Sequence, residues 1–298
     1  MLSFRRISID AVEVFKRFFP LRTSLNAGNS FTNLCAYDFI YPAEYVVYGD
    51  TLLTRIHLKK DEHICYYQPV NGNIEDFSEE IERQAQEQKQ VLSIIVESRE
   101  LADRFVSKGY RAEYSETLSE YVYKRENLEC LKGKRLQAKR NHINKFVSLY
   151  PDWQYVSLSS ADKDECLELN SLWLQQELLQ IPQYEKDYLI ESRVIEYLFD
   201  NFEALNLIGG AIKTGGKMIA YSLGSVICRN TFDTNIEKAD RNYEGAYTII
   251  NREIAKHLNS DILFINREED KGIAGLRKAK QSYHPEFMVE KYIVSKEF

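Results

Sequence analysis

The sequence has 298 residues, of which 44% are hydrophobic and 12% aromatic, and its formal net charge is −6. A chain of this length can bury one large core or two smaller ones, and this composition excludes a disordered or collagen-like chain. The mildly acidic balance argues against a general nucleic-acid-coating protein, although it leaves room for a local basic patch.

The five cysteines are widely spaced and include no CxxC pair, which disfavours a disulfide framework and a cysteine-rich zinc site. We therefore expect reduced thiols and no bound metal. The sequence has no apolar run of membrane-spanning length, and its start lacks the apolar stretch of a signal peptide. These features predict a cytoplasmic protein without a transmembrane segment.

In the first half, helix-like and strand-like segments follow one another along the chain. Helical periodicity and capping residues predict helices at 9–19, 74–88 and 101–108. Apolar and alternating runs between turn signals predict strands at 45–48, 52–58, 64–70, 91–96 and 117–124.

The polar stretch 124–130 marks the best domain boundary and predicts an N-terminal domain, 1–128, and a C-terminal domain, 129–298. In the second half, helices are predicted at 131–150, 162–179, 188–202, 245–258 and 273–280. Strands are predicted there at 205–213, 218–228, 231–236, 262–265 and 287–294.

Both halves end in the order helix, strand, helix, strand. The sequence of residues 91–110 can be aligned with 261–283, and that of 117–124 with 288–296. The alignment indicates either a duplicated module or chance similarity between α/β segments. This ending, after a meander of antiparallel strands, resembles the order of the GNAT acyltransferase fold. The resemblance implies an α/β protein with mixed sheets, built from two tandem GNAT-like domains. It also implies that two neighbouring parallel strands splay apart to admit an acyl donor.

The segment from 130 to 151 is basic, with six Lys or Arg residues and no acidic one. On the predicted helix the basic side chains border an apolar stripe, which is a suitable place to bind a phosphate-bearing ligand. Lys139, Arg140 and Asn144 are the candidate binding residues here. The alternative is a solvated helix whose lysine stems cover apolar surface.

The segment 231–247 combines a strand with the start of a helix. Alternation places Asp233, Asn235 and Glu237 on one side of the strand, and Glu237 is our candidate general base. Lys238, Tyr243 and Gly245 are candidates for binding a donor, because the amides at a helix start can hold phosphate. GNAT enzymes usually carry R/Q-x-x-G-x-G/A at this place, whereas this sequence has N-x-x-G-x-Y, which weakens the case for coenzyme A. The alternative is a pair of surface ions on an edge strand.

The segment 265–285 is rich in ionisable residues and directly follows a buried strand, where ligands bind in open α/β sheets. Asn266 and Arg267 are candidate catalytic residues, with Glu268 beside them, and Tyr283 is a further candidate. Arg277 and Lys278 are candidate donors to a phosphate or a carbonyl oxygen. The alternative is a solvated loop and helix face.

One more segment, 29–37, contains Ser30, Asn33 and Tyr37 at the spacing of one face of a short helix. That face would aim the three side chains at one partner, although capping and core packing explain them equally well. The sequence has no P-loop, no dinucleotide-binding glycine motif and no GxSxG, which disfavours ATP-dependent chemistry and serine hydrolysis.

Four blocks, FTNL (31–34), KGKRLQAKRNHINKF (132–146), IEKADRNYEGAYTIINREIAKHL (236–258) and INREEDKGIAGLRKAKQSYHPEFMVEKY (265–292), resemble the C-terminal domain of phosphatidylglycerol lysyltransferases. The resemblance implies tandem GNAT-like domains and transfer of an aminoacyl group from charged tRNA to a hydroxyl or amine. Those relatives carry a membrane domain before this region. Because this sequence has none, we expect a soluble acceptor or a peripheral encounter with the membrane.

Two hypotheses follow. The first is an acyl- or aminoacyl-transferase without a tightly bound cofactor, which uses aminoacyl-tRNA or acyl-CoA as donor. Its acceptor would be a small molecule, a peptide or a lipid headgroup. The second is a binding module that holds RNA or a phosphate-bearing metabolite without turnover.

Overall fold

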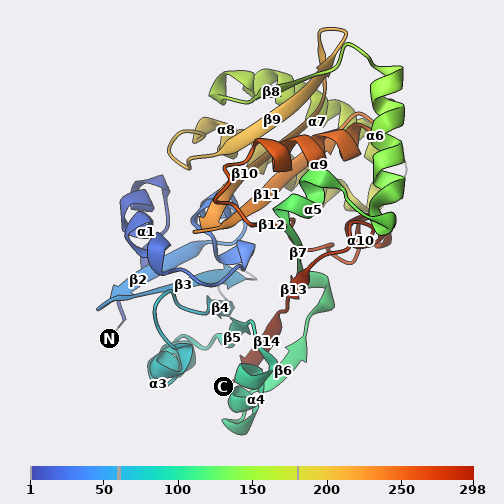
Figure 1. Cartoon of the computed structure of the whole chain (residues 1–298). Coiled ribbons are helices and arrows are strands. Elements are labelled where there is room, and N and C mark those ends of the chain that lie inside the picture. Colours follow the sequence, from blue (N-terminus) through green and yellow to red (C-terminus); the bar gives the residue numbers. More distant parts are fainter. Residues whose placement is uncertain (1, 59–61, 180) are drawn as a thin grey trace.

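The computed structural model describes residues 2–58, 62–179 and 181–298, which form two mixed β-sheets covered by helices (Figure 1). The strands of the first sheet lie in the order β1 (Arg5–Arg6), β2 (Ala43–Tyr48), β3 (Thr51–Leu58), β4 (His63–Tyr67), β5 (Val91–Val96), β14 (Tyr292–Lys296), β6 (Arg111–Tyr114). The strands of the second lie in the order β8 (Gln154–Ser157), β9 (Ile208–Thr214), β10 (Lys217–Cys228), β11 (Thr231–Ala239), β12 (Phe264–Asn266), β7 (Glu120–Lys124), β13 (Phe287–Val289).

The two sheets repeat one arrangement. Within the described residues, neighbouring strands run antiparallel except for one parallel pair in each sheet, β4 with β5 and β11 with β12. The parallel pair occupies the same place in both strand orders. The predicted α/β class with two repeated domains is therefore confirmed.

The last strand of each half lies in the sheet of the other half. β7 precedes the predicted boundary at 128/129, yet it pairs with β12 and β13 in the second sheet. β14 comes from the far end of the chain and pairs with β5 and β6 in the first sheet. In Figure 1 these strands run through the middle and lower part of the molecule. Each sheet is therefore completed by a strand from the other part of the chain.

Helices cover each sheet because each has an apolar stripe that packs on the strands. Their bounds are α1 (Val12–Phe18), α2 (Phe31–Ala36), α3 (Ser78–Gln88), α4 (Arg99–Ser107), α5 (Arg125–Cys130), α6 (Gln137–Leu149), α7 (Lys163–Leu178), α8 (Glu185–Asp200), α9 (Ala246–His257) and α10 (Ala274–Gln281). Figure 1 shows α5 and α9 on one side of the second sheet and α7 and α8 on the other. Two separate clusters of buried side chains fill these layers, one around Ile250 of α9 and one around Leu198 of α8.

The predicted and observed elements differ in several places, among them the short strand β1 and the start of α6. The polar stretch chosen as a boundary forms α5, which packs on α9. The short exposed strand β6 and the strand β8 were not predicted, because neither has an apolar run. The strand predicted at 287–294 is two strands, β13 and β14, which lie in different sheets. Among the described residues, no helix combines the length and apolarity needed to cross a bilayer.

Candidate functional site

The parallel strands β11 and β12 stay together over only part of their length. Thr231–Asp233 pairs with Phe264–Asn266, and no pairing between the two strands continues beyond that point among the described residues. β11 runs on to Ala239, while the chain after β12 turns away as a loop. The strands therefore diverge where the GNAT resemblance implies, and Glu237 and Arg267 lie on the diverging segments.

Glu237 and Arg267 form an ion pair between the two diverging segments. Arg267 Nη2 lies 2.7 Å from Glu237 Oε1, and the side chains are only 12% and 11% exposed, respectively. The amide of Asn251, on α9, donates to Glu237 Oε2 at 3.2 Å. Arg267 Nη1 is buried and has no hydrogen-bond partner among the residues that the structure describes. The pair therefore holds the guanidinium in place and leaves one of its nitrogens with donor capacity for a ligand.

Tyr283 and Lys139 complete this group. Lys139 Nζ lies 3.9 Å from the centre of the Tyr283 ring, and Arg267 Cζ lies 5.1 Å from the same centre. Both distances are typical of cation–π contacts. Burial and the nearby Arg267 charge lower the pKa of Lys139 to about 8. We call Glu237, Arg267, Tyr283 and Lys139 the Arg267 cluster.

The loop after β12 is fixed by a buried lysine from α10. The Lys280 ammonium donates to the carbonyl oxygens of Arg267, Glu268 and Glu269, and the residue is only 7% exposed. Burial and the Arg267 charge together lower the pKa of Lys280 to about 8, while the Glu269 carboxylate acts in the opposite direction. The lysine thereby sets the directions in which the three side chains of the loop leave the backbone.

A second polar group joins the two halves of the chain beside the Arg267 cluster. Asn33 Nδ2, on α2, donates to Glu268 Oε1 at 2.9 Å and approaches Asp233 Oδ2 at 3.4 Å. Asn235 Nδ2 donates to Asn33 Oδ1 at 3.1 Å and to Asp233 Oδ2 at 2.9 Å. The segment 29–37 thus contains a short helix, α2; its Asn33 meets the polar face of β11, whereas the hydroxyl of Ser30 caps the helix by accepting from the Asn33 amide. We call Asn33, Asp233, Asn235 and Glu268 the Asn33 cluster.

Asn266 and Lys238 lie outside the Arg267 cluster. Asn266 is fully buried, and its amide donates to Glu120 Oε2 at 2.6 Å and to the carbonyl of Leu25 at 2.8 Å. Lys238 follows Glu237 on the strand and so points to the opposite face, where it pairs with Glu191 at 2.8 Å. Both polar groups already bind protein partners, which fits a structural role for each.

Two candidate donors on α10 also lie apart. Arg277 pairs with Asp270 at 2.8 Å and with Glu116 at 3.2 Å. Lys278 is exposed on the same helix. α10 therefore supplies the site with Lys280, which holds the loop, rather than with a row of free cations.

Gly245 and Tyr243 stand at the start of α9. Gly245 has φ +88°, and a Cβ atom there would lie 2.9 Å from the carbonyl oxygen of His142 and 3.0 Å from Cβ of Phe146. Glycine is therefore needed at this position, because φ is positive and α6 passes close to the backbone. Tyr243 packs on Tyr150, with ring centres 5.1 Å apart.

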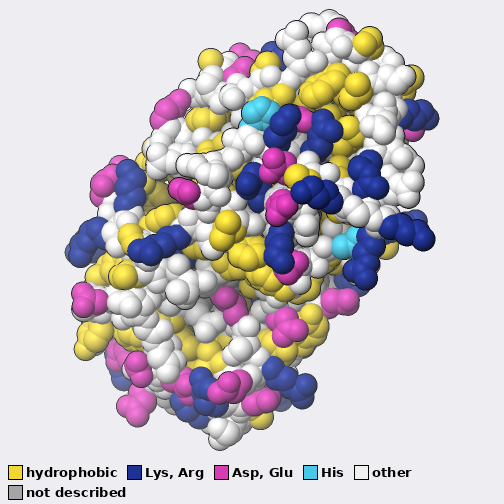
Figure 2. Space-filling view, in the orientation of Figure 1, with side chains coloured by type: hydrophobic (Ala, Val, Ile, Leu, Met, Phe, Trp, Pro, Cys, Tyr) yellow, Lys and Arg dark blue, Asp and Glu magenta, His cyan; other side chains and the backbone are white. Residues whose placement is uncertain are grey.

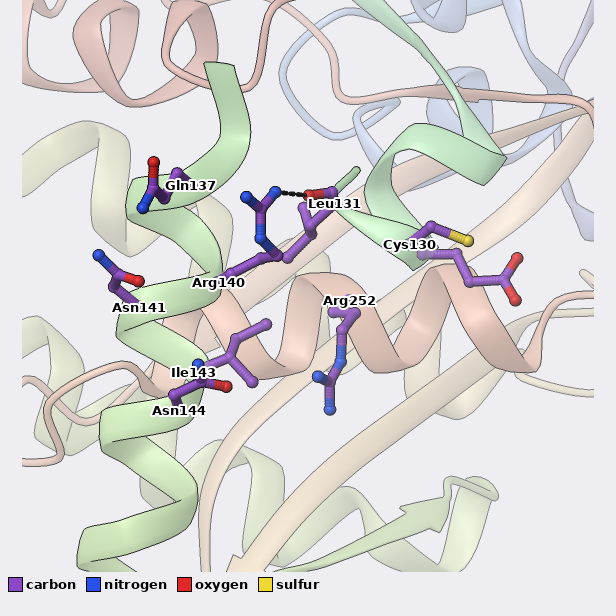
Figure 3. Close-up of a pocket in the computed structure, with 9 residues that line it drawn as sticks. Cys130, Leu131, Gln137, Arg140, Asn141, Ile143, Asn144 and Arg252 are labelled. Atoms are coloured by element: carbon purple, nitrogen blue, oxygen red, sulfur yellow. Dashed lines mark hydrogen bonds between the residues drawn. The ribbon is translucent and has the colours of Figure 1, made fainter. Parts of the chain in front are cut away.

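Arg140 and Asn144 line a small polar pocket between α5, α6 and α9 (Figure 3). The pocket has a volume of about 260 Å³. Arg140 Nη1 donates to the carbonyls of Leu131 and Gly133, so the guanidinium fixes the turn before α6. In Figure 3, Arg252 of α9 reaches the same pocket from the other side.

Basic side chains gather on the surface near the Arg267 cluster. Figure 2 shows Lys and Arg over the region that α6 and α10 occupy in Figure 1. Two of these lysines have acidic neighbours: Lys145 pairs with Glu244 at 2.6 Å and Lys132 with Glu126 at 3.4 Å. The exposed cations of this α6–α10 basic surface are Lys132, Lys134, Arg135, Lys145 and Lys278.

The structure thus brings together four of the twelve candidate site residues, namely those of the Arg267 cluster. Sequence reasoning placed Asp233 and Glu268 near the site but did not identify them as its polar junction with Asn33. It missed Asn251, which lies inside a predicted helix, six residues after Gly245, the nearest candidate. The structural role of Lys280 has no local signal, because its partners are backbone carbonyls.

The chain matches the family described as phosphatidylglycerol lysyltransferase, C-terminal, over residues 21–295. A curated relative, an uncharacterized protein of Mycoplasmoides gallisepticum, is 27% identical over 182 residues, which are 60% of this chain and 56% of the relative. The chain therefore spans only about half the length of this curated relative.

Three solved structures are similar along their length. A conserved protein of unknown function from Bacteroides thetaiotaomicron is 32% identical, with a TM-score of 0.91 and 100% of both chains covered. L-PGS from Bacillus licheniformis is 14% identical, with a TM-score of 0.65 over 98% of this chain and 93% of that one. A tandem GNAT protein from the clavulanic acid biosynthesis pathway is 9% identical, with a TM-score of 0.51 over 100% of this chain and 98% of that one.

The last two likenesses show the fold alone, which is that of two tandem GNAT-like domains. The family match covers nearly the whole chain. The protein therefore belongs to the family of phosphatidylglycerol lysyltransferase C-terminal domains.

Proposed function

We propose that this protein is an acyl- or aminoacyl-transferase that moves an activated acyl group to an amine or hydroxyl acceptor. Family membership and the tandem GNAT-like fold support a transferase of this general type. The observation that carries the proposal is the Arg267 cluster, which lies where β11 and β12 diverge.

The cluster supplies electrostatic catalysis. Acyl transfer places negative charge on the carbonyl oxygen, and a fixed buried donor stabilises that charge without reorganising. Arg267 Nη1 is such a donor, because the ion pair with Glu237 and the aromatic rings of Tyr123 and Tyr283 hold the guanidinium. Lys139 adds a second positive group beside the same ring.

Within this proposal, aminoacyl-tRNA is the preferred donor over acyl-CoA. The start of α9 carries N-x-x-G-x-Y in place of the R/Q-x-x-G-x-G/A that GNAT enzymes usually carry there. The exposed cations of the α6–α10 basic surface lie nearby and suit a larger polyanion, which would contact them from outside. The acceptor in this proposal is a small molecule, a peptide or a lipid headgroup.

The test is a transfer assay with labelled donors. Lysyl-tRNA, alanyl-tRNA and acetyl-CoA are each offered with dipeptides, polyamines or phosphatidylglycerol vesicles, and products are separated and counted. We expect product from an aminoacyl-tRNA and a loss of at least about 100-fold with Arg267→Gln. Arg135→Gln, on the exposed face before α6, is the matched control and should weaken tRNA binding without abolishing turnover.

The binding-module alternative gives a different result. In that case the protein binds tRNA with an affinity that falls as salt rises, yet no donor and acceptor pair yields product. Salt-sensitive binding without any transfer would therefore overturn the proposed activity and select the alternative.

A further inference from the structure

Glu268 is held in an unusual backbone conformation. Its φ is +54°, which is left-handed and uncommon for a residue that is neither glycine nor asparagine. Its amide donates to Asn266 Oδ1 at 2.8 Å, and its carbonyl accepts from the amide of Tyr121 at 3.2 Å and from Lys280 Nζ at 3.1 Å. Such conformations persist only where the surroundings enforce them, and they are frequent at functional sites.

The carboxyl group of Glu268 is also arranged asymmetrically. Oε1 accepts from Asn33 Nδ2 at 2.9 Å, whereas no hydrogen-bond partner of Oε2 is found among the described residues. The side chain is only partly buried. Asn33, from the first half of the chain, therefore orients Oε1 of Glu268. Oε2 has no such partner in the described part of the chain and can accept a proton.

The charged groups around Glu268 set its proton affinity. Burial and the Glu269 carboxylate raise the pKa of Glu268 to about 7, against the hydrogen bond from Asn33 and the charges of Lys271 and Lys280. Asp233 on β11 contributes a further acidic group, whose own pKa burial and Glu268 raise well above its usual value. Tyr37, which directly follows α2, also faces this group of charges.

Glu237 is differently placed. Its Oε1 accepts from Arg267 and its Oε2 from Asn251, so both oxygens already have donors. Each oxygen keeps acceptor capacity beyond its one donor, but the carboxylate is tied to a buried guanidinium, which suits holding that cation in place.

We propose that Glu268, positioned by Asn33, accepts the proton of the attacking acceptor group; this rests on the transfer reaction proposed above. The acceptor's hydroxyl or amine proton passes to Glu268 Oε2 while its lone pair bonds to the donor's carbonyl carbon. The bond from that carbon to the donor's oxygen or sulfur then breaks. The proton moves from Glu268 to this leaving atom, which restores the carboxylate.

The test compares pH profiles of kcat/KM for the wild type, Glu268→Gln, Glu269→Gln and Asn33→Ala, using the aminoacyl-tRNA and acceptor that give product. The wild-type rate should fall below about pH 7 as Glu268 is protonated. Glu268→Gln should lose at least about 100-fold and lose this acid limb. Circular dichroism checks that each variant is folded.

The two other variants separate catalysis from structure. Glu269→Gln removes a repulsive carboxylate from the same loop. This variant should therefore keep the wild-type rate above pH 8, and the acid limb of its pH profile should move to lower pH. Asn33→Ala removes the hydrogen bond that favours the ionised form, so it should move the limb to higher pH. A variant that was merely misfolded would lower the rate at every pH without moving the limb.

A second readout does not depend on turnover. In protein labelled with ¹³C at glutamate side-chain carboxyls, the signal that disappears in Glu268→Gln should titrate with a midpoint near 7. A wild type that transfers while Glu268→Gln stays within about threefold, or a midpoint near 4.5, would overturn the role of Glu268. If the wild type transfers no acyl group from any donor, the proposed function itself is overturned. This outcome is distinguishable from failure of the Glu268 role, because it is seen before any variant is assayed.

Discussion

Lys291 and Glu120 form a buried ion pair at the point where the two exchanged strands leave their own halves of the chain. Lys291 directly precedes β14 and Glu120 begins β7, and their side chains are only 7% and 0% exposed. Glu120 also accepts from the amide of Asn266, which ends β12. The strand exchange and the functional site therefore share one set of buried polar contacts.

The strand exchange predicts that neither part of the chain folds alone. A fragment of residues 1–128 would contain β7 without its sheet, and its own sheet would lack β14 between β5 and β6. A fragment of residues 129–298 would have the complementary defects. We expect poorly dispersed amide NMR spectra from each fragment and a native-like spectrum when the two are mixed. A dispersed spectrum from either fragment by itself would contradict this expectation.

The Glu237–Arg267 pair should show strong energetic coupling. Removing one partner of a buried pair leaves an uncompensated charge, so Glu237→Gln alone should cost about 3 kcal/mol of unfolding free energy. The double variant with Arg267→Gln should cost clearly less than the two single changes together. Urea unfolding of all four proteins measures this coupling. The exposed pair Lys145–Glu244 is the control and should couple by less than about 1 kcal/mol.

Lys280→Met should destabilise the loop after β12. The change leaves the carbonyls of Arg267, Glu268 and Glu269 without this donor, so we expect a loss of about 2–3 kcal/mol. Hydrogen exchange in residues 266–270 should become faster. Lys278→Met removes the same charge from the exposed face of the same helix, and it should stay within about 0.5 kcal/mol of the wild type. Equal effects of the two changes would argue against the loop-holding role.

Glu268→Gln should raise stability more at high pH than at low pH. Because the folded-state pKa is raised to about 7, the folded protein favours the protonated group, and this stability is lost as pH rises through the folded pKa. Replacement by the neutral amide should therefore raise Tm at pH 8, with a gain on the order of 1–3 kcal/mol in unfolding free energy, and change it little at pH 4.5. Calorimetry across this range measures the effect, and a gain confined to low pH would have the wrong sign.

Local patterns were sufficient for most elements and for part of the site. Strands such as β5 and helices such as α9 carry their periodicity in their own residues, and Glu237 and Arg267 could be chosen because each follows a strand-like run. The exchange of β7 and β14 depends on pairing between segments that are far apart in the sequence. A short stretch of sequence contains no information about such pairing. Residues 287–294 have a continuous strand-like composition, so the crossing at Glu290–Lys291 could not be seen.

The remaining site residues were hidden for a similar reason. Asn33 and Glu268 lie 235 positions apart, and only the packing of α2 against the second half brings them into contact. Lys238 is a predicted donor-binding residue near the start of α9, yet it follows Glu237 directly on the strand, and adjacent side chains on a strand point to opposite faces. Gly245 was assigned to ligand binding, whereas its tightest contacts are with α6.

The place of β14 also orders events during synthesis. The first sheet needs residues 292–296 between β5 and β6, so it cannot close while the ribosome is still translating the second half. Until then the nascent chain carries β5 and β6 with open edges, which are prone to mispairing. Both halves must therefore reach their final form together, once residues 292–296 have been synthesised.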